Sequence, residues 1–224
     1  DSSKSTQKQV DQSIRKYNQL QTAQSYVMQY AHEAFRTAGV DANTYMETVT
    51  SFSAALISSL GGDTVKAAEV ANMAMIDMAD NSNKMGTSME AIQNAYQGFA
   101  KQNYTMLDNL KLGYGGTRSE MQRLLKDAEK IQKQNGKNVK YNIKNLSDVY
   151  EALHVIQTEL GITGTTAKEA EGTIQGSFNM MRAAWMNLQI AMADPKGNVK
   201  GAISDLAKSA KSVAKNVLPV VKTA

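Results

Sequence analysis

The sequence predicts an all-α fold, a bundle of about seven to eight helices joined by short loops, with room for an elongated arrangement. Apolar residues recur at spacings of three and four along almost the whole chain. The 224 residues include only two prolines, Pro195 and Pro219, so no proline interrupts a helix before Pro195. Good helix formers (Ala, Met, Gln, Lys, Leu and Glu) are frequent.

Capping residues and glycines mark the expected helix boundaries. Residues of the N-cap type occupy the expected starts, which are Asp41 or Asn43, Asp63, Thr87, Thr117, Ser147 and Thr166. The expected stops are Gly39, Gly61, the polar cluster 80–83, Gly113, Gly136, Gly161 and the pair Asp194-Pro195. Residues 137–145 are expected to form a polar loop, with weak strand tendency at 139–143.

Three of these starts have the capping-box pattern, in which a Thr or Ser and a Glu three residues later satisfy backbone N–H groups reciprocally. They begin at Thr87, at Thr117 with Glu120, and at Thr166 with Glu169. A glycine turn, Gly113, Gly115 and Gly116, precedes the second box. A phosphate-binding loop would need GxxxxGK[ST] after a buried strand, which is absent here, so these residues are interpreted as a structural turn and caps.

The clearest amphipathic stripe follows the third box. Its members are spaced four, three, four, three and four residues apart, which is the heptad pattern of helix-on-helix packing. They are Ile174, Phe178, Met181, Trp185, Leu188 and Met192. This seam could be buried within the chain, or it could pair with a second copy or another protein; burial within the chain is the commoner use of such a stripe.

The charge distribution divides the chain in two. From Pro195 onward the sequence has six lysines and one acid, Asp205, which gives this part a net charge of +5. Residues 1–194 carry −1, and the whole chain carries +4. We therefore expect a helical domain at 1–194, in which 1–40 forms a leading extended helix, and a basic amphipathic helical tail at 195–224. The tail could make a weak, salt-sensitive contact with DNA, although a solvated helix edge is the simpler interpretation. The start at Asp1, without an initiator Met, suggests a segment of a longer protein.

The residues indicate no catalytic centre, no metal site and no cofactor. There is no cysteine, and His32 and His154 are the only histidines, so neither thiol chemistry nor a His-based metal cluster is expected. Both histidines are interpreted as half-buried helix residues. Thirteen methionines suit an irregular core or an adaptable binding surface. No apolar run reaches the roughly 18 residues that a membrane span needs, so no membrane insertion is expected.

Several stretches taken in order are more specific than any single motif. They occupy residues 78–87, 92–104, 106–117, 160–170, 174–178 and 181–185, and include Asp80-Asn81-Ser82-Asn83 and Leu110-Lys111-Leu112-Gly113-Tyr114-Gly115-Gly116. Over about residues 25–194 the chain resembles the tape measure domain of the tails of long-tailed bacteriophages and prophages.

This resemblance implies a mostly helical, multicopy virion protein in the lumen of the tail tube, assembled in the host bacterial cytoplasm. It implies roles in setting tail length and in genome delivery. The implied partners are the tail tube protein, the tail tip and distal tail proteins, the tail assembly chaperones and other copies of the chain. The long repetitive ruler region of the family is missing, so this part is expected to be a folded module from which a ruler extends.

Two other functions remain open at this point. The methionines and the heptad seam would also suit a partner-binding helical module or a secreted effector with a Met-rich interaction surface. A muralytic enzyme would need paired carboxylates or metal ligands, and no such signature is recognisable. We therefore expect no enzyme activity.

Overall fold

The computed structural model describes the backbone of residues 2–223 and the side chains of 7–169, 172–173, 175–219 within it. Over this range the protein folds into nine α-helices and one 3-10 helix, without a strand. The predicted all-α class is confirmed. The elements are α1 Ser2–Thr37, α2 Ala42–Ser59, α3 Thr64–Met85, α4 Met89–Ala100, η1 Leu107–Leu110, α5 Arg118–Gln134, α6 Leu146–Glu159, α7 Thr165–Gly172, α8 Ile174–Ala193 and α9 Val199–Thr223.

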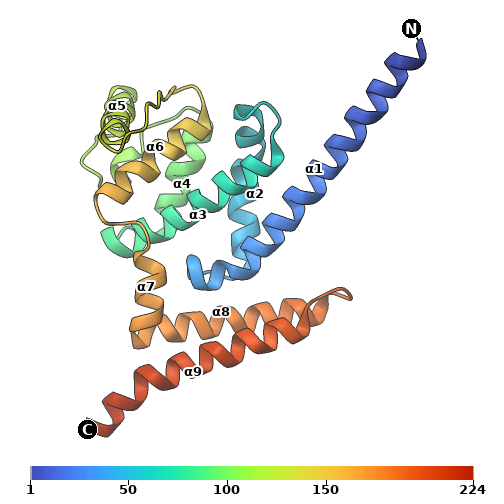
Figure 1. The fold of residues 1–224 in the computed structure, drawn as a ribbon. Coiled ribbons are helices and arrows are strands. Elements are labelled where there is room, and N and C mark those ends of the chain that lie inside the picture. The colour runs from blue at the N-terminus through green and yellow to red at the C-terminus, as the bar shows by residue number, and fades with distance from the viewer. Residues whose placement is uncertain (1, 224) are drawn as a thin grey trace.

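The body of the molecule is built around α3, which contacts α1, α2, α4, α6 and α7 (Figure 1). Its core contains an aromatic cluster contributed by α2, α4 and α6. The ring of Tyr150 meets Phe52 edge-on at 5.5 Å and lies 5.0 Å from Tyr96. The Tyr150 hydroxyl donates to the Tyr96 carbonyl oxygen at 2.9 Å, so this polar group is satisfied inside the core.

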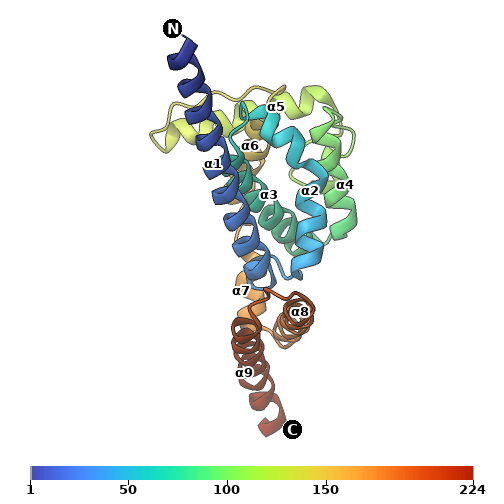
Figure 2. The same cartoon turned by 90° about the vertical axis from the view of Figure 1, so that its right-hand side faces the viewer.

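The long first helix belongs only partly to the body. Its N-terminal half projects past the other helices (Figures 1 and 2), and the first buried side chain along it is Ala23. Val10, Ile14, Tyr17 and Leu20, which form the apolar stripe predicted for this segment, are all exposed. Its C-terminal half packs on α3 and α2 through Ala31, Ala34 and Ala38.

The last two long helices form an antiparallel hairpin beneath the body, and the short α7 connects them to it (Figure 1). A small second core joins this hairpin to the end of α1, where Phe35 contacts Met180, Ala183 and Ala184. His32 Nε2 lies 2.9 Å from a carboxylate oxygen of Asp205 at the same place. The part of the basic segment that the structure describes therefore packs along α8 through α9.

Many predicted boundaries are confirmed. Asp41, Asp63 and Thr117 accept hydrogen bonds as the N-caps of α2, α3 and α5. Gly39 follows α1 in the left-handed conformation, with φ of +67°, as expected of a helix-ending glycine.

Several local predictions are wrong. The cluster 80–83 does not break α3, which continues to Met85. The N-caps of α4 and α6 are Ser88 and Asn145 in place of Thr87 and Ser147. The helix expected to run through to Ala193 is interrupted at Thr173, which ends α7 and caps α8 through its hydroxyl. This interruption lets the hairpin leave the body in a new direction.

Candidate functional site

The two buried carboxylates of the described chain, Asp77 and Asp80, lie one turn apart on α3 and are at most 1 % exposed. Carboxylates are rarely buried this deeply unless partners compensate for the lost water. Here the partners come from α6 and α7, so these residues, together with Asn81, form a polar joint between α3 and later parts of the chain. We refer to them as the α3 joint.

Asp80 supplies the N-terminal cap of α7 from a distant part of the sequence. Its carboxylate accepts the backbone N–H of Gly164 at 2.6 Å and that of Thr166 at 2.8 Å. The residue at the N-cap position, Gly164, has no side chain to do this. Because the first N–H groups of a helix lack partners within the helix, Asp80 satisfies donors that would otherwise be orphaned. The cap fixes the start of α7 to the middle of the body.

The predicted capping box at Thr166 and Glu169 is therefore wrong. Thr166 lies inside α7, one residue after its start, and its N–H is bound by Asp80. Its hydroxyl oxygen has no hydrogen-bond partner in the structure. Glu169 is exposed one turn later. The carboxylate of Asp80, which lies far away in the sequence, caps this helix in place of the local Thr166 hydroxyl.

Asp77 pairs with His154 of α6, whose Nδ1 lies 2.9 Å from one carboxylate oxygen and 3.0 Å from the other. Burial raises the pKa of Asp77 to about 6, although the hydrogen bond from His154 works in the opposite direction. The same hydrogen bond raises the pKa of His154 against the effect of its own partial burial. The prediction that His154 is a half-buried helix residue is confirmed, since its side chain is 36 % exposed.

The third residue of the joint reaches η1. The Asn81 side-chain amide donates to the Leu110 carbonyl oxygen at 3.0 Å, and the Thr87 hydroxyl donates to the Asn109 carbonyl oxygen at 2.9 Å. Both bonds satisfy carbonyls of a short 3-10 turn that cannot pair them internally. The α3 joint thus gathers η1, α6 and α7 around the C-terminal half of α3.

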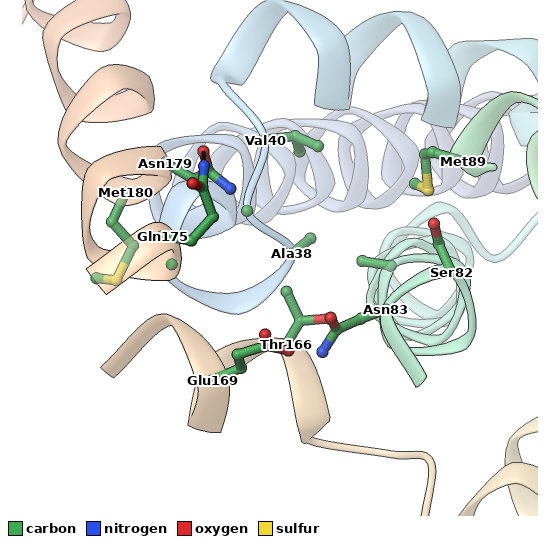
Figure 3. A pocket seen from close by; sticks show the side chains of 13 residues that line it. Ala38, Val40, Ser82, Asn83, Met89, Thr166, Glu169, Gln175, Asn179 and Met180 are labelled. Atoms are coloured by element: carbon green, nitrogen blue, oxygen red, sulfur yellow. Dashed lines mark hydrogen bonds between the residues drawn. The ribbon is translucent and has the colours of Figure 1, made fainter. Parts of the chain in front are cut away.

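A hollow of about 370 Å³ lies beside this joint, between the body and the hairpin. Figure 3 shows side chains from α3, α7 and α8 facing it, most of them amides and hydroxyls, with Glu169 as its one charged lining residue. Its lining residues are Ala38, Gly39, Val40, Ala79, Ser82, Asn83, Met89, Thr166, Glu169, Gln175, Gly176, Asn179 and Met180. Such a lining offers hydrogen bonds and holds no paired acid and base at its walls.

The predicted heptad seam lies mostly on the solvent side of α8. Trp185 is 52 % exposed and Met192 is 69 % exposed, and Phe178 is exposed as well. Met181 is half-buried, and Leu188 alone of the described members is buried. The side chain of Ile174 lies outside the described residues. The face that α8 turns toward the protein instead carries mainly small and polar residues, namely Ser177, Met180, Ala183, Ala184 and Asn187.

The predicted glycine turn and its cap are present before α5. Gly113 has a φ of +84°, and a Cβ on Gly116 would collide with the Thr105 carbonyl. The Thr117 hydroxyl accepts the Glu120 N–H at 3.2 Å, which is half of the expected capping box. The other half is not formed, because Glu120 accepts the N–H of Gly115 at 3.0 Å instead of that of Thr117. The hydrogen bond from Arg123, together with that from Gly115, lowers the pKa of Glu120 to about 2. The turn is thereby tied to the helix that follows it.

The described lysines of the basic segment are exposed. They are Lys196, in the turn before α9, and Lys200, Lys208, Lys211 and Lys215 on α9, while Lys222 lies outside the described side chains. Lys208 lies 3.3 Å from Asp205. The positive charge of this face can attract an anionic partner over a long range, but the lysines form no defined site that would distinguish one anionic partner from another.

No three His, Asp or Glu side chains of the described residues group as metal ligands would. None of the helices, as far as they are described, combines the length and apolar character required to cross a bilayer. The chain matches no protein-family model, and no curated protein or solved structure matches it. The α3 joint and the exposed face of α8 are therefore the features on which a function can be argued.

Proposed function

We propose that this chain is a folded module of a tape measure protein from the tail of a long-tailed phage or prophage. The support is the ordered set of stretches at 78–87, 106–117 and 160–170, which resemble that family. In the structure these stretches meet at the α3 joint. They act together there as one structural unit, although up to 86 residues separate the partners.

Most contacts within the joint connect the quoted stretches, and the Asp77–His154 pair lies just outside them. Asp80 and Asn81 belong to the first, the carbonyl of Leu110 to the second, and the N–H groups of Gly164 and Thr166 to the third. This coherence supports treating the three stretches as a single structural motif.

In the proposed role, the body is an anchor and the long helices extend from it. The axial rise of a helix is fixed at about 1.5 Å per residue, so the 36 residues of α1 span roughly 54 Å. A helical protein of fixed rise can give a tube a finite length, and a folded module can dock it at one end. The proposed partners are the tail tube protein, the tail tip and distal tail proteins and the assembly chaperones, in the lumen of the tail.

The first experiment asks whether the chain is a component of the tail. Particles from the host bacterium are purified on a density gradient, and their proteins are identified by peptide mass spectrometry. We expect peptides from residues 25–194 in tailed particles, and loss of normal tails in electron micrographs when the gene is disrupted. A plasmid copy should restore them. Normal tails after disruption, or particles that lack the chain, would refute the proposal.

The exposed α8 face favours a second candidate function, a helical module that binds another protein outside any virion. Phe178, Trp185 and Met192 give that face the aromatic and methionine content typical of binding surfaces. The gene would then lie outside a tail gene cluster. The chain would be recovered from cells or culture medium that contain no particles, which separates the two functions.

A further inference from the structure

The composition of α8 does not suit a helix with one side in water. Its 20 residues, Ile174–Ala193, include a single charged side chain, Arg182. Helices at a protein surface usually carry several charges on their solvent side. Among the exposed polar residues Gln175, Asn179 and Gln189, the solvent side of α8 carries Phe178, Trp185 and Met192, which are 44, 52 and 69 % exposed. A row of large apolar side chains on a nearly uncharged surface is typical of a face that another surface covers.

The spacing of the seam reads the same in both directions. The intervals from Ile174 to Met192 are four, three, four, three and four residues, so an antiparallel copy presents its apolar residues at the same spacing. In such a pair Met181 of one helix meets Trp185 of the other, so the two central layers are apolar on both sides, as knobs-into-holes packing requires. Phe178 lies level with Leu188, which is buried within its own chain and adds little to the contact.

We propose that a second copy of this chain covers the seam, in antiparallel orientation, about a two-fold axis that crosses the seam midway between Met181 and Trp185. The two α8–α9 hairpins would then form a four-helix bundle at the centre of a dimer. A two-fold contact uses the same surface on both copies, so a face that is self-complementary needs no second binding site. This inference does not depend on the proposed function.

The exposed apolar area is sufficient for such a contact. At about 150–250 Å² for a large side chain, the exposed fractions of Phe178, Trp185 and Met192 leave roughly 330 Å² uncovered per copy. Two copies supply about 660 Å² of apolar surface. Interfaces are only about 60 % apolar, so the total is about 1,100 Å², which exceeds the roughly 1,000 Å² expected of a specific contact.

The charges around the seam distinguish a second copy from an anionic partner. Lys208, Lys211 and Lys215 line the solvent side of α9, and Arg182 is the only charge on α8. Two such surfaces repel each other weakly, so added salt should leave the dimer unchanged or strengthen it. DNA or an acidic protein bound to the same lysines would instead be released by salt.

The primary test is the mass of the purified chain in solution. Sedimentation equilibrium from about 1 to 100 µM, a range in which micromolar complexes form, should show a rise from 24.4 kDa to twice that value. Trp185 is the only tryptophan, so its emission should shift to the blue and resist iodide quenching over the same range. A monomer at every concentration, with Trp185 equally quenched throughout, would overturn the proposal.

A matched pair of variants locates the contact. Phe178→Lys places a charge in the seam, and Leu20→Lys makes the same change at a 55 % exposed position of α1, far from it. We expect the first variant to remain monomeric and the second to dimerise like the parent. Both positions are exposed, so circular dichroism should show unchanged helix content. A dimer that persists in Phe178→Lys would contradict the assignment.

The absence of cysteine allows the orientation to be tested directly. In the antiparallel pair the two copies of residue 182 lie roughly 3 Å apart along the axis, whereas those of residue 192 lie roughly 27 Å apart. A short bifunctional maleimide should therefore crosslink Arg182→Cys to itself and leave Met192→Cys uncrosslinked. Efficient crosslinking of Met192→Cys would indicate a parallel pair and would overturn the two-fold arrangement.

Discussion

Replacing Asp80 with alanine should weaken the protein far more than replacing an exposed capping aspartate. The carboxylate accepts two backbone N–H groups, at 2.6 and 2.8 Å, in a fully buried position. Hydrogen bonds to charged groups contribute about 1.5–3 kcal/mol each, and their removal also leaves two buried donors unsatisfied. The variant no longer buries a charge, which offsets part of the loss. We expect the free energy of unfolding to fall by about 3 kcal/mol.

Asp63 provides a matched control for this measurement. It also caps a helix, accepting the Lys66 N–H at 3.0 Å, but it is exposed. Loss of such a cap costs about 1 kcal/mol. Urea unfolding followed by circular dichroism should give a midpoint about 1–2 M lower for Asp80→Ala than for the parent, and a much smaller change for Asp63→Ala.

Amide hydrogen exchange locates the effect of Asp80→Ala within the structure. The amides of Gly164 and Thr166 should lose protection in the variant, because Asp80 is their acceptor. Amides in the core of α4 should keep theirs. If Asp80→Ala is no more destabilising than Asp63→Ala, or if the two α7 amides stay protected, the description of Asp80 as the cap that fixes α7 is incorrect.

Two further variants test the turn and the buried ion pair. Gly116→Ala should cost about 1–3 kcal/mol because its Cβ would overlap the carbonyl of residue 105, whereas Gly115→Ala, with 3.6 Å to its nearest neighbour, should change the thermal midpoint little. The pKa values of Asp77 and His154 are both raised by folding, so the folded protein binds more protons than the unfolded chain. Its free energy of unfolding should therefore fall as pH rises from about 5 to 8, by at most about 1.4 kcal/mol per pH unit for each proton. Urea midpoints across this range should vary less in an Asp77→Asn/His154→Gln double variant, and an equal dependence in both proteins would contradict the assignment.

Local signals in the sequence were sufficient for much of the fold. Gly39, Asp63 and Thr117 act within one turn of their own positions, so capping and left-handed geometry could be recognised without knowing the tertiary structure. The all-α class followed from periodicity, which is also local.

The α3 joint was missed because its meaning depends on partners elsewhere in the chain. Asp80 and Asn81 resemble a polar break when only their neighbours are considered, but their hydrogen bonds go to residues 29 to 86 positions away. One signal was present: cluster 80–83 contains neither glycine nor proline, and Met78 and Met85 continue the apolar register on either side. A polar cluster that leaves helical periodicity intact is better interpreted as a buried contact than as a stop.

The seam illustrates a different limit of sequence reasoning. Periodicity identified the apolar stripe of α8, but it could not determine which surface would cover it. The structure places Ala183 and Ala184 against the body, and small residues of this kind let helices approach closely without large side chains. The large residues Phe178 and Trp185 are thereby left free for a contact between molecules.

The joint and the seam occupy successive parts of one mechanical connection. Asp80 fixes the start of α7, and Thr173 ends α7 and begins α8 within a single residue, so the direction of the seam is set by the body. The contact of Phe35 with Met180 gives the hairpin a second support. Two separate supports prevent rotation about either one. A partner bound to the seam is therefore held at a fixed angle to α1, as a structural component needs and a flexible tether would not provide.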